Sequence, residues 1–178
     1  MNQQTLTMKK NEIEMNPIGL SRETAEMLVP RMDEQMASLF TLFHQYQKHH
    51  WLVMGPQFRD LHLYLEESYN QVHQDLDAVA ERITVLGGVP SSNMTALVNA
   101  SYVEEEPEGV FSVRDMLVRD RDTEKMISSN LRPLIERCRE VGDYGSEQLL
   151  KNVLLRSEER CHELDHYLEN DSLEKSSS

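Results

Sequence analysis

Five side chains in the first half of the sequence have the types and spacing of metal ligands. Two are histidines, and three are carboxylates that follow them along the chain: His50, His62, Glu66, Asp77 and Glu81. Imidazole nitrogen combined with carboxylate oxygen suits a borderline divalent metal such as Fe(II) or Zn(II). The region therefore predicts a metal site with mixed nitrogen and oxygen ligands.

The two histidines flank a turn that the sequence predicts at Gly55-Pro56. If the helices on either side pack antiparallel, His50 near the end of the first lies level with His62 near the start of the second. Glu66 follows His62 by four residues and therefore shares its helical face, one turn further along. Taken alone, either histidine could be a packing residue. The surrounding pattern favours the metal interpretation.

The second carboxylate pair raises a geometric problem. Asp77 and Glu81 also share one helical face, but Asp77 lies 15 residues beyond His62 on the same predicted helix. At ~1.5 Å per residue the separation is roughly 22 Å, whereas a metal–ligand bond is only about 2 Å long. Either the two groups are unrelated, or they meet across a two-fold axis between antiparallel copies of this helix. The spacing does not decide between these alternatives.

Apolar periodicity and helix-breaking residues predict four long helices. The first is capped near Ser21 and stops at Gly55-Pro56, with Pro30 either in its first turn or kinking a helix already begun. The others run from near Phe58 to Gly87-Gly88, from Ser112 to about Glu140, and from Ser146 to about Glu169. The long acidic segment 91–109 suits a crossover with room for a short helix. This pattern predicts an all-α, ferritin-like four-helix bundle with a long crossover between its second and third long helices.

Length and composition fit one such domain. The chain has 178 residues, few glycines and prolines, and a net charge of −13. We expect a flexible N-terminal arm over 1–20, the bundle over 21–170 and a disordered tail over 171–178. Cys138 and Cys161 match neither a disulfide framework nor a zinc ribbon, which indicates free thiols in a reducing cytoplasm. We see neither a signal peptide nor a membrane span, and thus expect a cytoplasmic protein.

Two stretches resemble the signatures of the Dps family of mini-ferritins. The first has the pattern H-W-x-V-x-G-x5-L-H-x3-E from His50 to Glu66. The second has the pattern L-D-x-V-A-E-R-x3-L-G-x2-P from Leu76 to Pro90. Both occur in the family's order, on the second helix and its flanks, and the helix pattern agrees over about residues 20–170.

The resemblance implies a hollow homo-dodecamer built from two-fold dimers, with ferroxidase centres at the dimer interfaces. His50, His62 and Glu66 would come from one subunit and Asp77 and Glu81 from its mate, which would answer the geometric problem. Glu66 stands where the family more often has Asp, which puts occupancy of the second metal position in doubt. Such proteins oxidise Fe(II), preferentially with hydrogen peroxide, store the ferric mineral inside and protect against oxidative stress. Zinc could occupy the same site.

Other residues admit two interpretations. Trp51, beside a ligand, could be a radical sink or a packing residue at the helix end. His73 and His162 could add nitrogen ligands to the interfacial site or simply face solvent, and we expect His44 and His49 to be structural. Two Glu-x-x-His motifs, at Glu159/His162 and Glu163/His166, lie on one helix only, which argues against a di-iron centre inside the bundle.

Asp143 and Glu147, near the start of the last helix, are candidates for an acidic iron pore at the three-fold axis, or for complementing the helix dipole. Some mini-ferritins condense DNA through basic tails. In this chain Lys9 and Lys10 are offset by Glu12 and Glu14, and phosphate binding needs several cations. DNA binding is therefore open but not favoured. A rival function is a nucleoid-associated protein whose cage mainly shields DNA.

Overall fold

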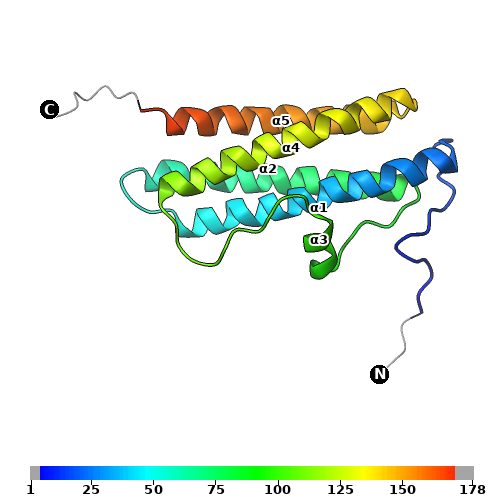
Figure 1. The fold of residues 1–178 in the computed structure, drawn as a ribbon, viewed down its shortest axis with the longest axis horizontal. Helices are drawn as coiled ribbons and strands as arrows, with labels where there is room; N and C mark the ends of the chain where they lie inside the picture. Colours follow the sequence, from blue (N-terminus) through cyan, green and yellow to red (C-terminus); the bar gives the residue numbers. More distant parts are fainter. Residues whose placement is uncertain (1–4, 171–178) are drawn as a thin grey trace.

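The computed structural model describes residues 5–170, and in this range the chain forms five helices and no strand (Figure 1). The long helices are α1 (Arg22–Leu52), α2 (Phe58–Val85), α4 (Val113–Glu140) and α5 (Tyr144–Leu168), and the short α3 spans Met94–Ala100. α1 packs most extensively on α2 and α4 on α5. The predicted all-α bundle with a long crossover is confirmed, and the short helix α3 lies within that crossover.

The helix ends follow the capping residues of the sequence. The side chains of Ser21 and Ser112 accept hydrogen bonds from the backbone N–H groups of Thr24 and Asp115, each at 3.1 Å, which satisfies free donors at the starts of α1 and α4. Pro30 lies inside α1, in a helix that has already begun. α5 begins at Tyr144, two residues before the predicted start, because Asp143 serves as its N-cap.

The segment before α1 contacts the bundle. Ile13 is 8% exposed and belongs to the hydrophobic core. The backbone N–H of Glu14 donates to the carbonyl of Gly87 at 2.9 Å, where Gly87 adopts φ 85° just beyond α2. A side chain on Gly87 would collide with the backbone of Glu14. The expected flexible arm is thus docked along part of its length. Residues 1–4 and the expected tail 171–178 lie outside the described residues.

A buried ionic network joins the four long helices. Arg160 of α5 is 2% exposed, and its Nε donates to the Glu124 carboxylate of α4 at 2.6 Å. Glu124 also accepts hydrogen bonds from the Tyr46 hydroxyl of α1 at 2.9 Å and from the Ser157 hydroxyl at 2.6 Å. Asp75 of α2 lies 3.7 Å from Nη1 of Arg160. Each charge in this interior therefore has partners from other helices, as burial requires.

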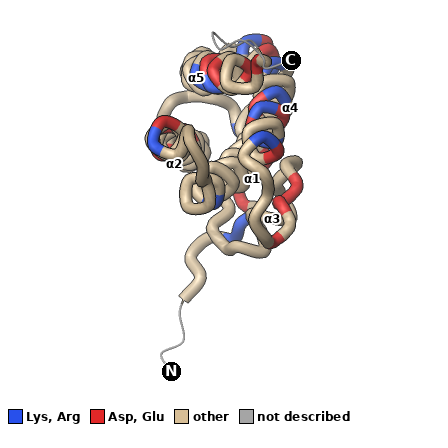
Figure 2. Tube along the Cα trace, turned by 90° about the vertical axis from the view of Figure 1, so that its left-hand side faces the viewer, with Lys and Arg blue, Asp and Glu red and all other residues tan. Residues whose placement is uncertain are grey.

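None of the helices in residues 5–170 has an apolar stretch of the length that a bilayer span requires. In the end view of Figure 2, lysine and arginine alternate with acidic residues along the helices, and no basic stripe is visible on this side.

The ionic network yields a stability prediction. Arg160→Leu should lower the free energy of unfolding by about 3–5 kcal/mol, because it leaves the buried Glu124 carboxylate without its cation. Arg132→Leu is the matched control: it breaks an ion pair with Glu158 whose side chains are 55% and 46% exposed, and should cost less than about 1 kcal/mol. Guanidinium denaturation followed by circular dichroism measures both variants. Equal losses would contradict a special role for the buried pair.

Candidate metal half-site

His50 and His62 face each other across the α1–α2 turn. Nδ1 of each ring lies 2.9 Å from the backbone carbonyl oxygen of the other histidine. The rings stack with centroids 3.7 Å apart and an interplanar angle of 21°. A carbonyl can only accept, so each Nδ1 carries the proton. In the neutral ring this tautomer leaves the Nε2 lone pair free, and it is the form that binds metals.

Local sequence builds this pairing. Gly55 adopts φ 103°, a conformation that favours glycine, and its carbonyl accepts from the N–H of Phe58 at 3.0 Å to close the turn. The Phe58 ring stacks on His62 at 4.9 Å, and the Tyr69 ring meets His50 edge-on at 5.3 Å. Both imidazoles are half-buried. Packing and hydrogen bonds thus fix the rings before any ligand arrives.

The three carboxylates lie further along α2. Glu66 is half-buried one turn beyond His62, whereas Asp77 and Glu81 are exposed. Because α2 is continuous from Phe58 to Val85, the separation of roughly 22 Å between His62 and Asp77 stands. Over residues 5–170, no three His, Cys, Asp or Glu side chains gather as a metal-binding group. One chain thus brings two predicted ligands together and leaves Asp77 and Glu81 far away.

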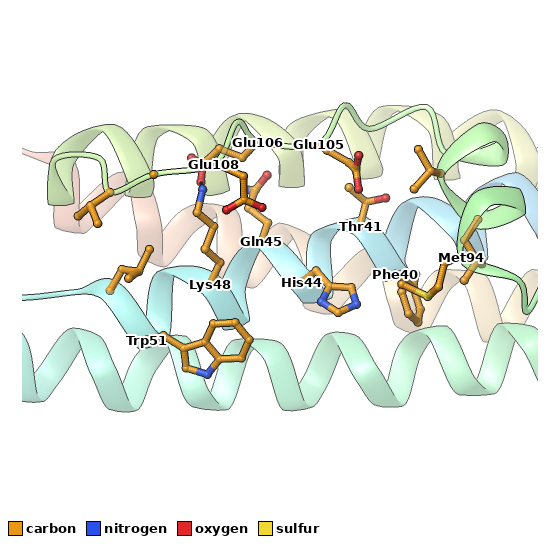
Figure 3. A pocket seen from close by; sticks show the side chains of 15 residues that line it. Phe40, Thr41, His44, Gln45, Lys48, Trp51, Met94, Glu105, Glu106 and Glu108 are labelled. Atoms are coloured by element: carbon orange, nitrogen blue, oxygen red, sulfur yellow. Dashed lines mark hydrogen bonds and ion pairs between the residues drawn. The ribbon is translucent and has the colours of Figure 1, made fainter.

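Trp51 lies at the surface of α1. Its side chain is 65% exposed and lines a groove of about 590 Å³ between α1 and the crossover, together with Lys48 and Glu108 (Figure 3). In the same groove Lys48 forms an ion pair with Glu106 at 2.5 Å. Within one subunit, Trp51 is therefore not part of the packed core. The radical-sink interpretation stays a prediction.

His73 and His162 do not approach each other within the chain. His73 is exposed on α2 one turn before Asp77, and its ring lies 5.4 Å from that of Phe43 on α1. His162 lines a groove between α4 and α5 with Lys125 and Ser128. Of these two histidines, only His73 therefore lies on the same exposed face of α2 as Asp77.

The two pore candidates already have cationic partners. Asp143 is buried, accepts from the Ser146 N–H at 3.0 Å and forms an ion pair with Arg82 at 2.6 Å. Glu147 pairs with Lys151 at 2.5 Å and with Arg139 at 3.1 Å. The hydrogen bond from Lys151, reinforced by Arg139, lowers the pKa of Glu147. The expected pore function of these two carboxylates stays a prediction.

His49, expected to be structural, lies in the interior between two carboxylates. The imidazole is buried, with Nδ1 2.9 Å from the Asp120 carboxylate and Nε2 3.2 Å from the Glu106 carboxylate. Burial alone would lower the pKa of His49, but the hydrogen bonds and charges of Asp120 and Glu106 outweigh it and raise the pKa. The spacing of buried Leu42, Tyr46 and His49 was the available signal for this inward orientation.

Comparisons with known proteins place the chain in a family. The ferritin-like domain family matches residues 31–173. A nutrient stress-induced DNA-binding protein of Nostoc is 35% identical, covering 96% of this chain and 92% of the relative. A DNA protection during starvation protein of Halobacterium salinarum is 34% identical, covering 88% and 86%.

Solved structures agree with these relatives. The crystal structure of an archaeal Dps homologue from Halobacterium salinarum superposes with a TM-score of 0.93 at 32% identity, covering 98% of both chains. DpsC from Streptomyces coelicolor also gives a TM-score of 0.93, at 27% identity, covering 96% of this chain and 100% of that one. These matches agree with the two signature stretches and with the bundle and its long crossover. The chain therefore belongs to the Dps family of ferritin-like proteins.

Proposed function

We propose that this protein oxidises Fe(II) and stores the ferric product inside a dodecameric cage, protecting the cell from peroxide. The observation that carries the proposal is the paired imidazoles, whose reciprocal Nδ1–H···O=C bonds to the partner carbonyls leave both Nε2 atoms free. Nitrogen ligands fixed in this way, next to the carboxylate of Glu66, suit Fe(II) and also Zn(II). Zinc should therefore compete with iron.

In this proposal the site is completed by a second copy of the chain. A two-fold axis crossing α2 midway between His62 and Asp77 would place the Asp77 and Glu81 of each copy beside the His50, His62 and Glu66 of the other. The residue near that midpoint, Asn70, is exposed, as are Asp77 and Glu81. An isologous contact there yields two identical sites per dimer. His73, one turn before Asp77, is proposed as an additional nitrogen ligand.

The chemistry follows from the ligand set. Two Fe(II) ions each give one electron to hydrogen peroxide, its O–O bond breaks, and with two protons the products are two Fe(III) and two water molecules. Carboxylates from the two copies stabilise the more highly charged Fe(III). Because both electrons can be delivered together, hydroxyl radical is not released. Trp51, exposed beside His50, is proposed to donate an electron when only one iron is present.

Subunit complementation tests this arrangement. The variants His50→Ala/His62→Ala and Asp77→Ala/Glu81→Ala should each lose at least about 10-fold in the rate of Fe(II) oxidation by peroxide. When the two variants are co-expressed, about half of the dimers are mixed and each mixed dimer holds one intact site of two, so about one quarter of the parent rate should return. Stopped-flow absorbance of the ferric product measures the rates.

The control for complementation is co-expression of two variants that remove the same half-site, His50→Ala and His62→Ala. A mixed dimer of these two has no intact site, so no activity should return. Recovery in this control, or none in the first mixture although size-exclusion chromatography finds intact assemblies, contradicts a site shared between subunits. An inactive parent protein contradicts the ferroxidase function itself.

A second candidate function is DNA shielding, because the relatives from Nostoc and Halobacterium salinarum carry names that refer to DNA. The net charge of −13 and the mixed charges along the helices oppose it. In the N-terminal segment, Lys9 lies within 3.9 Å of Glu12, and Lys10 pairs with Asp33 at 2.9 Å. Both lysines are thus already partnered by carboxylates.

A gel-shift assay distinguishes the two functions. The parent protein should not retard duplex DNA at about 150 mM salt, where weak phosphate contacts are screened. The matched variant Glu12→Lys/Glu14→Lys, which gives the segment four lysines, should retard the same duplex at lower salt. Clear retardation by the parent at about 150 mM salt would favour the DNA-shielding function.

A further inference from the structure

A second pair of histidines lies on the exposed face of α5, outside the site described above. The sequence His162-Glu163-Leu164-Asp165-His166 has the H-E-x-x-H spacing, which on a helix places both imidazoles on one face. Glu159 lies on the same face, three residues before His162. In this stretch histidine and glutamate thus alternate along one exposed stripe.

The distance between the two Nε2 atoms is in the range of two ligands on one metal ion. Nε2 of His162 and Nε2 of His166 are 3.0 Å apart, and the rings meet edge-on with centroids at 4.3 Å. Metal–imidazole bonds of about 2.0–2.1 Å at angles of 90–109° separate neighbouring nitrogens by about 2.8–3.4 Å. Without a metal, the contact is a hydrogen bond between one protonated and one unprotonated Nε2. A cation bound to both nitrogens would replace that single proton and would lie beside the line between them, so the rings would turn to aim both lone pairs at it.

The surroundings favour a cation. Glu159 and Glu163 are exposed, and neither forms an ion pair with another residue in the described part of the chain. Their neighbours differ, since Glu158 pairs with Arg132 at 2.7 Å and Asp165 with Arg121 at 3.3 Å. Two carboxylates with uncompensated charge therefore flank the two imidazoles, which raises the local concentration of divalent ions.

This pair is separate from the α1–α2 half-site. The Tyr167 ring, next to His166, packs on Tyr64 of α2 at 5.2 Å. Tyr64 follows His62 by two residues, and a step of two residues on a helix turns the side chain by roughly 200°. The α5 pair therefore lies at the same end of the bundle as His62, but on the opposite side of α2. Neither pair can reach the other's metal within one chain.

We propose that His162 and His166 form a second divalent-cation site, a two-imidazole clamp for borderline transition metals such as Zn(II), Ni(II) and Cu(II). Two side chains of one helix supply the protein ligands, and water fills the remaining positions. The clamp needs no second subunit, and it is independent of the ferroxidase function.

Isothermal titration with Zn(II) on the full-length assembled protein tests the clamp. His162→Gln and His166→Gln should each remove one Zn(II) equivalent per chain, or weaken it at least about 10-fold, since one imidazole alone loses the chelate advantage. His44→Gln, which removes an exposed histidine from α1, is the matched control and should change nothing. Fe(II) oxidation should be unchanged in all three variants. Equal zinc binding by parent and clamp variants, or an equal loss in the control, overturns the proposal.

Discussion

The buried pair of Arg160 and Glu124 is the interaction on which the arrangement of the bundle depends. A guanidinium that is 2% exposed must be matched, and its carboxylate partners come from α2 and α4. The hydroxyl of Tyr46 adds α1 to the network by donating a hydrogen bond to Glu124. The rotation of each helix about its axis is thereby fixed, because a small turn would leave a buried charge unpaired. A second buried contact joins His49, three residues beyond Tyr46 on α1, to Asp120 on α4. It fixes the rotation of α1 at a second point.

This constraint determines which way the metal-binding face points. Successive residues of a helix are turned by about 100°. With Tyr46 and His49 facing the interior, His50 is directed toward α2, where it meets His62. The two adjacent histidines therefore have different chemistry: one is an internal ionic contact between carboxylates, and the other is a free imidazole held by a backbone carbonyl. The polar interior positions the half-site without belonging to it.

Local sequence predicted the helices and the His50–His62 pair, because caps, breakers and the short turn act over a few residues. Periodicity carried a signal for the inward orientation of His49, but its carboxylate partner could not be predicted, because Asp120 lies 71 residues away along the chain. The docking of Glu14 on Gly87 was missed for the same reason, because a polar segment gives no local sign of its partner. The early start of α5 depends on Asp143, for which the sequence suggested either a pore ligand or a residue that complements the helix dipole, but not the N-cap.

The two imidazole pairs differ in the structural elements that hold them. This difference determines whether metal binding at each pair requires a second subunit. His50 and His62 come from two helices, and reciprocal bonds to backbone carbonyls orient them. Two of their predicted carboxylate partners, Asp77 and Glu81, lie roughly 22 Å or more along α2, so a complete site inherits the geometry of the subunit contact. His162 and His166 belong to one helix turn, where the spacing alone brings their Nε2 atoms to 3.0 Å. Cation binding at α5 therefore requires only that one chain folds, whereas iron oxidation at the α1–α2 turn requires that two subunits assemble.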